Sequence, residues 1–190
     1  MSRSLQKWRA ERLPALRELD AARRGLAGSK RGRRFAIRQI HESYVVLLAS
    51  HFQGYCRDLH DECATLFVQS VPEGVLRSAF HAALVLGRKL DSGNANPGNI
   101  GSDFGRFGVD FWENVHGLDE SHPGRQKDLE ALNAWRNAIA HQHFDPKKLG
   151  GVELRLPLLR DWRAACNRLA AAFDAAMRSH FVAVNGSTPW

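Results

Sequence analysis

A short stretch combines residue types that suit phosphate chemistry: Trp135-Arg136-Asn137-Ala138-Ile139-Ala140-His141-Gln142-His143. Its apolar residues and those before it recur every three or four positions, the spacing of one helix face: Leu129, Leu132, Trp135 and Ile139. At about 100° per residue, Arg136 falls inside this apolar stripe, where a guanidinium is costly unless an anion meets it. His141 can donate and accept protons near neutral pH. Together these residues indicate chemistry at a phosphate.

The spacing of the two residues raises a geometric question. Five residues of ideal helix place His141 about 140° around from Arg136, so one straight helix separates them. Two solutions remain open: the last turn loosens before Asp145-Pro146, or the residues act across a two-fold dimer interface. His143, seven residues after Arg136, lies on almost the same face and is the second choice for the catalytic histidine. Asn137 would orient the phosphate or the histidine.

Structural roles are the alternatives for these residues. Arg136 would then hold a helical bundle in register through a buried ion pair, with Asp58, Glu62 or Asp174 as the partner. His141 would cap the helix C-terminus, where the helix dipole favours imidazolium. Because the residues occur together in this spacing, we favour catalytic roles for Arg136, His141 and Asn137.

The pattern gives no support for metal chemistry. The nine histidines include no His-Glu-x-x-His motif. The three cysteines, Cys56, Cys63 and Cys166, form no metal or redox motif. We interpret them as small buried apolar residues in a reducing compartment. The sequence therefore predicts no metal site and no cofactor.

Basic residues are concentrated near the N-terminus. The formal net charge is +7, and residues 1–40 alone hold twelve Lys or Arg against three acids. Such a region favours a polyanion through counterion release, and a solvated, solubilising face explains it equally well. The RNA-binding candidates are Arg31, Arg33, Arg34 and Arg38. With no apolar run long enough to span a bilayer and no signal-peptide pattern, we expect a cytoplasmic protein without membrane contact.

Helical periodicity runs through most of the chain. It predicts an all-α, antiparallel bundle of about five to six helices in a single domain, residues 1–190, with a basic N-terminal segment at 1–32. The longest pattern spans Arg33 to Gln69, and Gly54 within it indicates close packing. Pro14 marks a kink or a start near Leu13 in the first helix, 3–25. Other helices are expected at about 109–116, 123–144 and 158–184, the second of these stopped by Asp145-Pro146.

Two segments between these helices carry local signals. Ser70-Val71-Pro72-Glu73 matches a capping box, with serine as N-cap and glutamate three residues later, and predicts a helix that extends to about Leu90. Residues 91–108 are rich in glycine and asparagine. They do not match a phosphate-binding loop, because no Lys-Ser/Thr pair follows the glycines and no strand precedes them. We interpret this segment as a long loop and a candidate lid.

The run from Arg136 to His141 resembles the signature of the HEPN superfamily, the higher eukaryote and prokaryote nucleotide-binding domains. In that signature an arginine, often followed by asparagine, precedes a histidine by a few positions near the end of a late helix. The stretch 44–59 is similar to the early core helix of the RiboL-PSP branch, where an aromatic residue, an acid and a glycine follow an apolar run. This chain has Gln53 at the position where glutamate is expected, and Gln142 at the position where glycine often follows the histidine. The resemblance covers roughly residues 33–180.

This resemblance implies metal-independent cleavage of RNA by a homodimer whose motif helices face each other. We therefore expect an endoribonuclease that uses the 2′-OH of its RNA substrate as the nucleophile. The resemblance also implies a toxin or effector of a prokaryotic toxin–antitoxin or anti-phage defence system, with an antitoxin or defence protein as partner. Arginine suits the charge of the phosphorane, and histidine suits the proton transfers. The alternative is a non-catalytic HEPN-like module that binds nucleic acid or nucleotide, or mediates assembly.

Overall fold

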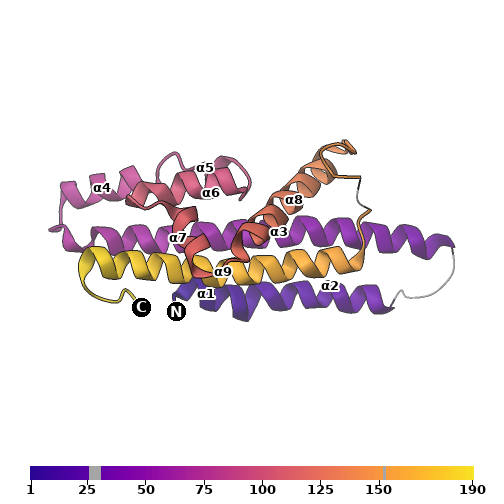
Figure 1. The fold of residues 1–190 in the computed structure, drawn as a ribbon, viewed down its shortest axis with the longest axis horizontal. Helices are drawn as coiled ribbons and strands as arrows, with labels where there is room; N and C mark the ends of the chain where they lie inside the picture. Colours follow the sequence, from indigo (N-terminus) through magenta and orange to yellow (C-terminus); the bar gives the residue numbers. More distant parts are fainter. Residues whose placement is uncertain (26–30, 152) are drawn as a thin grey trace.

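The protein is an all-α bundle. The computed structural model describes residues 1–25, 31–151 and 153–190, and no strand occurs in these ranges. Two long helices, α3 (Arg31–Phe67) and α9 (Leu156–Asn185), lie side by side and form its long axis (Figure 1). The N-terminal helices lie along this pair: α1 (Arg3–Lys7), a π-helical segment (Trp8–Arg12) and α2 (Leu13–Gly25). The predicted fold class is confirmed.

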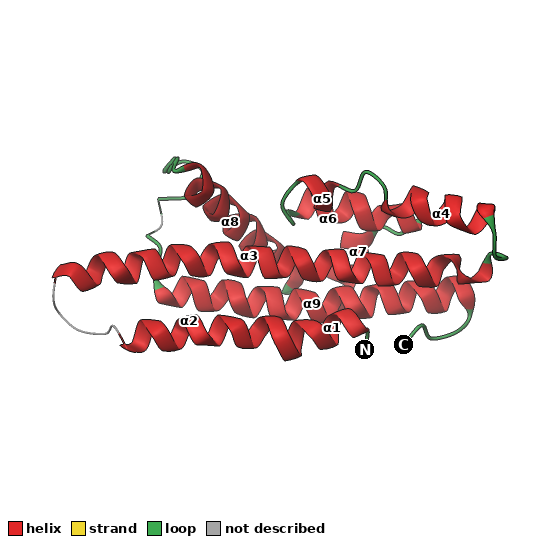
Figure 2. Cartoon of the chain, turned by 180° about the vertical axis from the view of Figure 1, so that it is seen from behind, coloured by secondary structure: helices red, strands yellow, loops and turns green. Residues whose placement is uncertain are grey.

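Shorter helices cover one end of α3. They are α4 (Val75–Val85), α5 (Lys89–Ser92) and α6 (Pro97–Phe104), with 3-10 turns at Val68–Ser70 and Gly105–Phe107. The chain then crosses to α9 through α7 (Phe111–Leu118) and α8 (His122–His141). Seen from either side, α8 slants away from the long pair, so its C-terminal end projects from the bundle (Figure 2).

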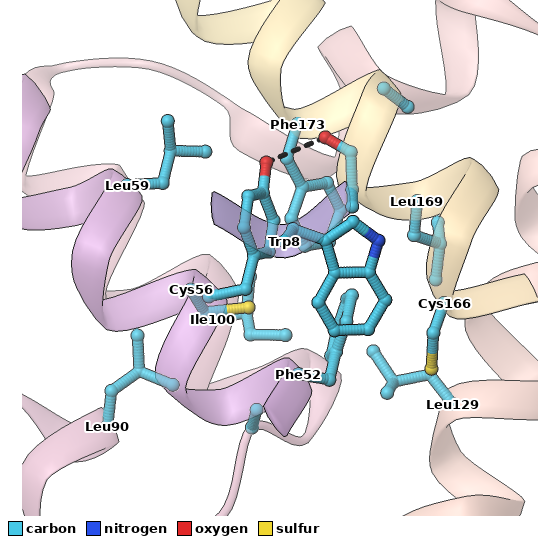
Figure 3. Close-up of a cluster of buried hydrophobic side chains, with 14 of the residues drawn as sticks. Trp8, Phe52, Cys56, Leu59, Leu90, Ile100, Leu129, Cys166, Leu169 and Phe173 are labelled. Atoms are coloured by element: carbon cyan, nitrogen blue, oxygen red, sulfur yellow. Dashed lines mark hydrogen bonds between the residues drawn. The ribbon is translucent and has the colours of Figure 1, made fainter. Parts of the chain in front are cut away.

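The core is filled mainly by aromatic and aliphatic side chains from α3 and α9. Trp8 from the π-helical segment and Phe52 from α3 pack edge to face, with ring centroids 5.8 Å apart, and Phe173 from α9 adjoins them (Figure 3). Cys56, Cys63 and Cys166 are buried free thiols, and burial raises the pKa of each. The interpretation of the cysteines as buried apolar residues is therefore confirmed.

The N-terminal segment belongs to this core, and Gly54 explains how closely it packs. Pro14 has no backbone N–H, so it cannot donate the hydrogen bond that a regular α-helical turn needs at this position. The chain forms a wider π-helical turn just before it. This turn presents Arg12 to α3, where its guanidinium donates to the carbonyl oxygen of His51 and to Asp58, both at 2.6 Å. A Cβ at Gly54 would lie 2.9 Å from Cζ of Arg12. The expected close approach at Gly54 is confirmed.

Two of the local predictions are wrong. Ser70 ends a 3-10 turn and Glu73 pairs with Arg77, whereas the next helix begins at Val75 with Gly74 as its N-cap. This helix ends at Val85 and does not reach Leu90.

The segment 91–108 is not a long loop. Asn96 accepts a hydrogen bond from the backbone N–H of Asn99, and Pro97 occupies the first turn, so α6 starts there despite its glycines. Ile100 and Phe104 of α6 are buried in the core. Only the short turn 93–96 between α5 and α6 and the terminal Gly108 remain irregular in this segment.

Candidate active site

The motif lies where α8 leaves the bundle. Leu129, Leu132 and Trp135 are buried, Arg136 and Ile139 are half-buried, and His141 is exposed. Arg136 therefore occupies the expected apolar stripe at the point where the stripe opens to solvent. An anion can reach the guanidinium there without crossing the core.

Arg136 has no carboxylate partner among the residues that the structure describes. Its Nη1 donates to Oδ1 of Asn137 at 3.1 Å, and its side chain makes no other hydrogen bond within the described structure. The three carboxylates considered as ion-pair partners are engaged elsewhere: Asp58 by Arg12 and Lys7, Glu62 by the backbone N–H groups of Arg3 and Ser4, and Asp174 by the N–H of Ser2 and the indole of Trp190. The buried ion pair is therefore not the role of Arg136 in this fold.

Asn137 is held by one residue from outside α8 and by its neighbour Arg136. A guanidinium carries only donors, so the atom of Asn137 that faces Arg136 must be the amide oxygen. The same oxygen accepts a hydrogen bond from Nδ2 of Asn94, in the turn between α5 and α6. One helical turn earlier, Nδ2 of Asn133 donates to the carbonyl oxygen of Ala95 at 3.0 Å. The turn 93–96 thus docks on α8 directly beside the motif.

The two candidate histidines stand at the end of α8, and both are exposed. Helix α8 is regular up to His141, so loosening of the last turn, one of the two solutions left open, does not occur before the histidine, and the predicted extension to Phe144 is wrong. The helix ends because Gln142 adopts the left-handed conformation, with φ 52°. The N–H of His143 and the side-chain amide of Gln142 cap the carbonyl oxygens of Ala138 and Ile139. The described hydrogen bonds therefore give the capping role to Gln142 and His143 rather than to the His141 imidazole.

A cavity of about 760 Å³ lies on another side of α8, bounded by α3 and the segment that follows the motif. Trp135 and Phe144 form part of its wall, with ring centroids 6.3 Å apart. The two arginines that line it are already paired, Arg38 with Glu42 and Arg155 with Glu153. Of the predicted RNA-binding residues, Arg38 is thus exposed but paired. The side chains of Arg31, Arg33 and Arg34 lie outside the described structure.

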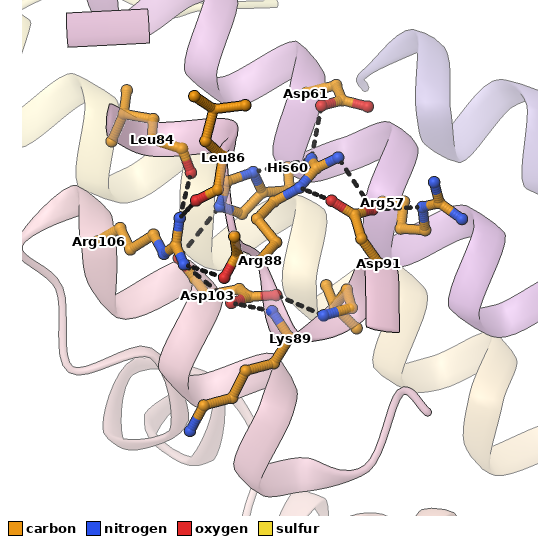
Figure 4. Close-up of polar contacts among 12 residues, drawn as sticks. Arg57, His60, Asp61, Leu84, Leu86, Arg88, Lys89, Asp91, Asp103 and Arg106 are labelled. Carbon is orange, nitrogen blue, oxygen red and sulfur yellow. Dashed lines mark hydrogen bonds and ion pairs between the residues drawn. The ribbon is translucent and has the colours of Figure 1, made fainter. Parts of the chain in front are cut away.

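A second polar cluster joins α3 to α5 and α6. Arg88 is buried and bonds Asp61 from α3 and Asp91 from α5 (Figure 4). His60 donates from Nε2 to the carbonyl oxygen of Asp103, and burial, with a smaller contribution from Arg88, lowers its pKa to about 4. The buried carboxylate of Asp103 accepts the first N–H groups of α5 from Lys89 and Leu90. This cluster is closed on itself and positions α5 and α6.

Comparison with protein-family models identifies the fold family. The model described as RiboL-PSP-HEPN matches residues 10–177, which is most of the chain. The protein belongs to the RiboL-PSP-HEPN family. Comparisons with curated proteins and with solved structures gave no match. The family assignment confirms the predicted resemblance to the HEPN superfamily, and HEPN domains are often ribonucleases.

Two further features bear on ligands and on membranes. Within residues 1–25, 31–151 and 153–190, no group of three or more His, Cys, Asp or Glu is arranged to hold a metal ion. None of the helices in these ranges is both long enough and apolar enough to cross a membrane.

Sequence reasoning missed three residues that support the motif: Gln53, Asn94 and Asn133. Gln53 was noticed only as a departure from the expected glutamate. Asn94 contacts Asn137 of α8 across 43 residues, and Asn133 of α8 contacts Ala95 across 38 residues, and periodicity carries no information about such contacts. The spacing of Asn133 does place it on the buried side of α8, three residues before Arg136, which was the available signal.

Proposed function

We propose that this chain is a metal-independent endoribonuclease. The observation that carries the proposal is the half-buried guanidinium of Arg136, which has no carboxylate partner in the described structure and lies beside Asn137. His141 is on the same helix end and exposed. An arginine that the fold leaves without a counter-charge is ready to bind an anion, and a phosphodiester matches its planar donors.

The reaction would use the substrate as its own nucleophile. A general base removes the proton of the 2′-OH, and O2′ attacks the adjacent phosphorus. The P–O5′ bond breaks, a general acid protonates the leaving O5′, and a 2′,3′-cyclic phosphate remains. Arg136 stabilises the charge on the crowded phosphorane, and the amide N–H of Asn137 donates to a phosphate oxygen. His141 moves the protons, with His143 as the second choice.

A homodimer would supply the second proton-transfer group. Because α8 is regular up to His141, its Arg136 and His141 point about 140° apart around the helix axis. Two copies related by a two-fold axis bring two histidines and two arginines to one interface. One histidine then acts as base and the other as acid. The proposal therefore requires a dimer with the two α8 ends facing each other.

The biological role rests on family membership. We propose a cytoplasmic toxin or effector of a prokaryotic toxin–antitoxin or anti-phage defence system, with RNA as substrate and an antitoxin or defence protein as partner. The alternative function is a non-catalytic module that binds nucleic acid or nucleotide, or mediates assembly. The separation of Arg136 from His141 within one chain favours this alternative if the protein is a monomer.

The test incubates purified protein with RNA in excess EDTA and compares the wild type with Arg136→Ala and His141→Ala. We expect cleavage in the chelator, and a loss of about 100- to 1000-fold on removing the arginine. Arg168→Ala, an exposed arginine on α9, is the matched control and should cleave normally. Intact RNA with a folded wild-type dimer would contradict the proposal. Loss of activity in His143→Ala but not in His141→Ala would reassign the histidine.

A further inference from the structure

Gln53, in the middle of α3, uses the nitrogen of its side-chain amide to hold the backbone just before Asn94, the residue that contacts the motif. Its Nε2 carries two N–H bonds, and these donate to the carbonyl oxygens of Leu90 at 2.8 Å and Gly93 at 2.7 Å. Both acceptors flank the end of α5, where backbone carbonyl oxygens lack partners within the helix. Gln53 therefore ties α3 to the start of the turn 93–96.

The turn 93–96 is also held from its other side. Nδ2 of Asn99 in α6 donates to the carbonyl oxygen of Asn94 at 2.8 Å. The N–H of Gly93 donates to the carbonyl oxygen of Lys89 at 2.7 Å. A Cβ at Gly93 would lie 2.8 Å from Nδ2 of Asn99, so the turn has no room for a side chain there. The position of Asn94 is thus fixed by α3, α5 and α6 together.

Asn94 connects this fixed turn to the motif by a direct hydrogen bond. Its Nδ2 donates to Oδ1 of Asn137, which also accepts from Nη1 of Arg136 at 3.1 Å. With both donors on its oxygen, Asn137 keeps its own Nδ2 without a partner among the described residues, on an exposed side chain. The hydrogen bonds therefore determine which end of the Asn137 amide remains available to a ligand.

We infer that Gln53 and Asn94 are positioning residues that set the orientation of the Asn137 amide beside Arg136, so that its nitrogen donates to the phosphate. The inference rests on the proposed function only for the identity of the ligand. Gln53 acts through the turn 93–96, and Asn94 acts by direct contact. Without Asn94, only the Arg136 side chain still donates to the Asn137 oxygen, and the amide can rotate so that this oxygen faces the anion and repels it.

In this chain, which departs from the family pattern of glutamate at position 53, the two carbonyl acceptors require the amide of glutamine there. A carboxylate has the same shape but only acceptors, and it would face two carbonyl oxygens. Gln53→Glu should therefore release the turn, while changing the side chain by one atom. Gln69→Glu makes the same change on an exposed glutamine in the 3-10 turn after α3 and serves as the control.

The experiment measures the side-chain amide signals of Asn137 by NMR together with the kinetics of RNA cleavage. The Asn137 signals are assigned from their loss in Asn137→Asp. We expect Gln53→Glu and Asn94→Ala each to shift them and to lower kcat by about 10- to 100-fold, with little change in KM. Because both residues act through one path, the double variant should lose no more than the worse single variant. Gln69→Glu should change neither the signals nor kcat.

Two outcomes would overturn the inference. One is a folded Gln53→Glu or Asn94→Ala protein with unchanged Asn137 amide signals. The other is a double variant whose losses in kcat multiply, because that result requires independent effects. If the wild type does not cleave RNA, the proposed function fails, and the amide signals alone still decide whether the positioning path exists. If Gln53→Glu does not fold, Asn94→Ala in the turn provides the same measurement.

Discussion

Two arginines differ in how their charges are paired. The region around Arg88 is called closed because its charges pair within the fold, and the region around Arg136 is called open because the charge of Arg136 does not. Arg88 is buried, with a side chain 8% exposed, and pairs with Asp61 and Asp91. Arg136 is half-buried near the end of α8, and within the described structure its side chain donates only to the amide oxygen of Asn137. The closed region satisfies its charges within the fold and joins its elements. The open region leaves the charge of Arg136 without a carboxylate partner among the described residues, as the proposed phosphate site requires.

The largest expected difference comes from the same substitution at both arginines. Arg88→Met leaves Asp61 and His60 without this donor and leaves Asp91 with Arg57 alone, and breaking such a buried pair costs about 3 to 5 kcal/mol. The cost should fall near the lower end, because Asp61 is 54% exposed. Arg136→Met should change the free energy of unfolding by less than about 0.5 kcal/mol. Urea unfolding of both variants measures the comparison, and equal losses would refute it.

The pH dependence of stability should report on the closed region. Burial lowers the pKa of His60 to about 4 in the fold, from 6.5 when unfolded. Folding therefore favours neutral His60, and this stability is present above pH 6.5 and lost as pH falls toward 4. The expected loss is about 3 kcal/mol. His60→Gln should remove this part of the pH dependence, and an unchanged slope in that variant would exclude His60 as its source.

The sequence predicted the parts of this comparison that depend on periodicity. The helical phase placed Arg136 in the stripe of Leu132 and Ile139, and the long runs predicted most of α3 and α9. It did not reveal the closed region, because Arg88, Asp61 and Asp103 come from separate elements that only the tertiary fold brings together. The capping-box pattern at Ser70 was misleading, since Gly74 starts the helix instead. The contact of Asn94 with Asn137 had no local signal.

The smallest expected effect is at the end of α8. Gln142 has φ 52°, a conformation that costs a non-glycine residue about 1 to 2 kcal/mol. Gln142→Gly removes that strain but also an exposed hydrogen bond from the side chain to the carbonyl oxygen of Ile139. We expect a net gain of about 0.5 to 1 kcal/mol in the free energy of unfolding. Thermal unfolding measures it, and a lower midpoint would mean that the hydrogen bond outweighs the strain.

The open region is tested most directly by the chemistry of the cleaved RNA. A defined oligonucleotide is incubated with the wild-type protein in EDTA, and the cleaved ends are identified by mass spectrometry. We expect 2′,3′-cyclic phosphate ends, and no cleavage of the same oligonucleotide carrying 2′-deoxy nucleotides at the cleaved positions. Uncleaved RNA with a folded dimer, or cleavage that persists in the 2′-deoxy substrate, would contradict it.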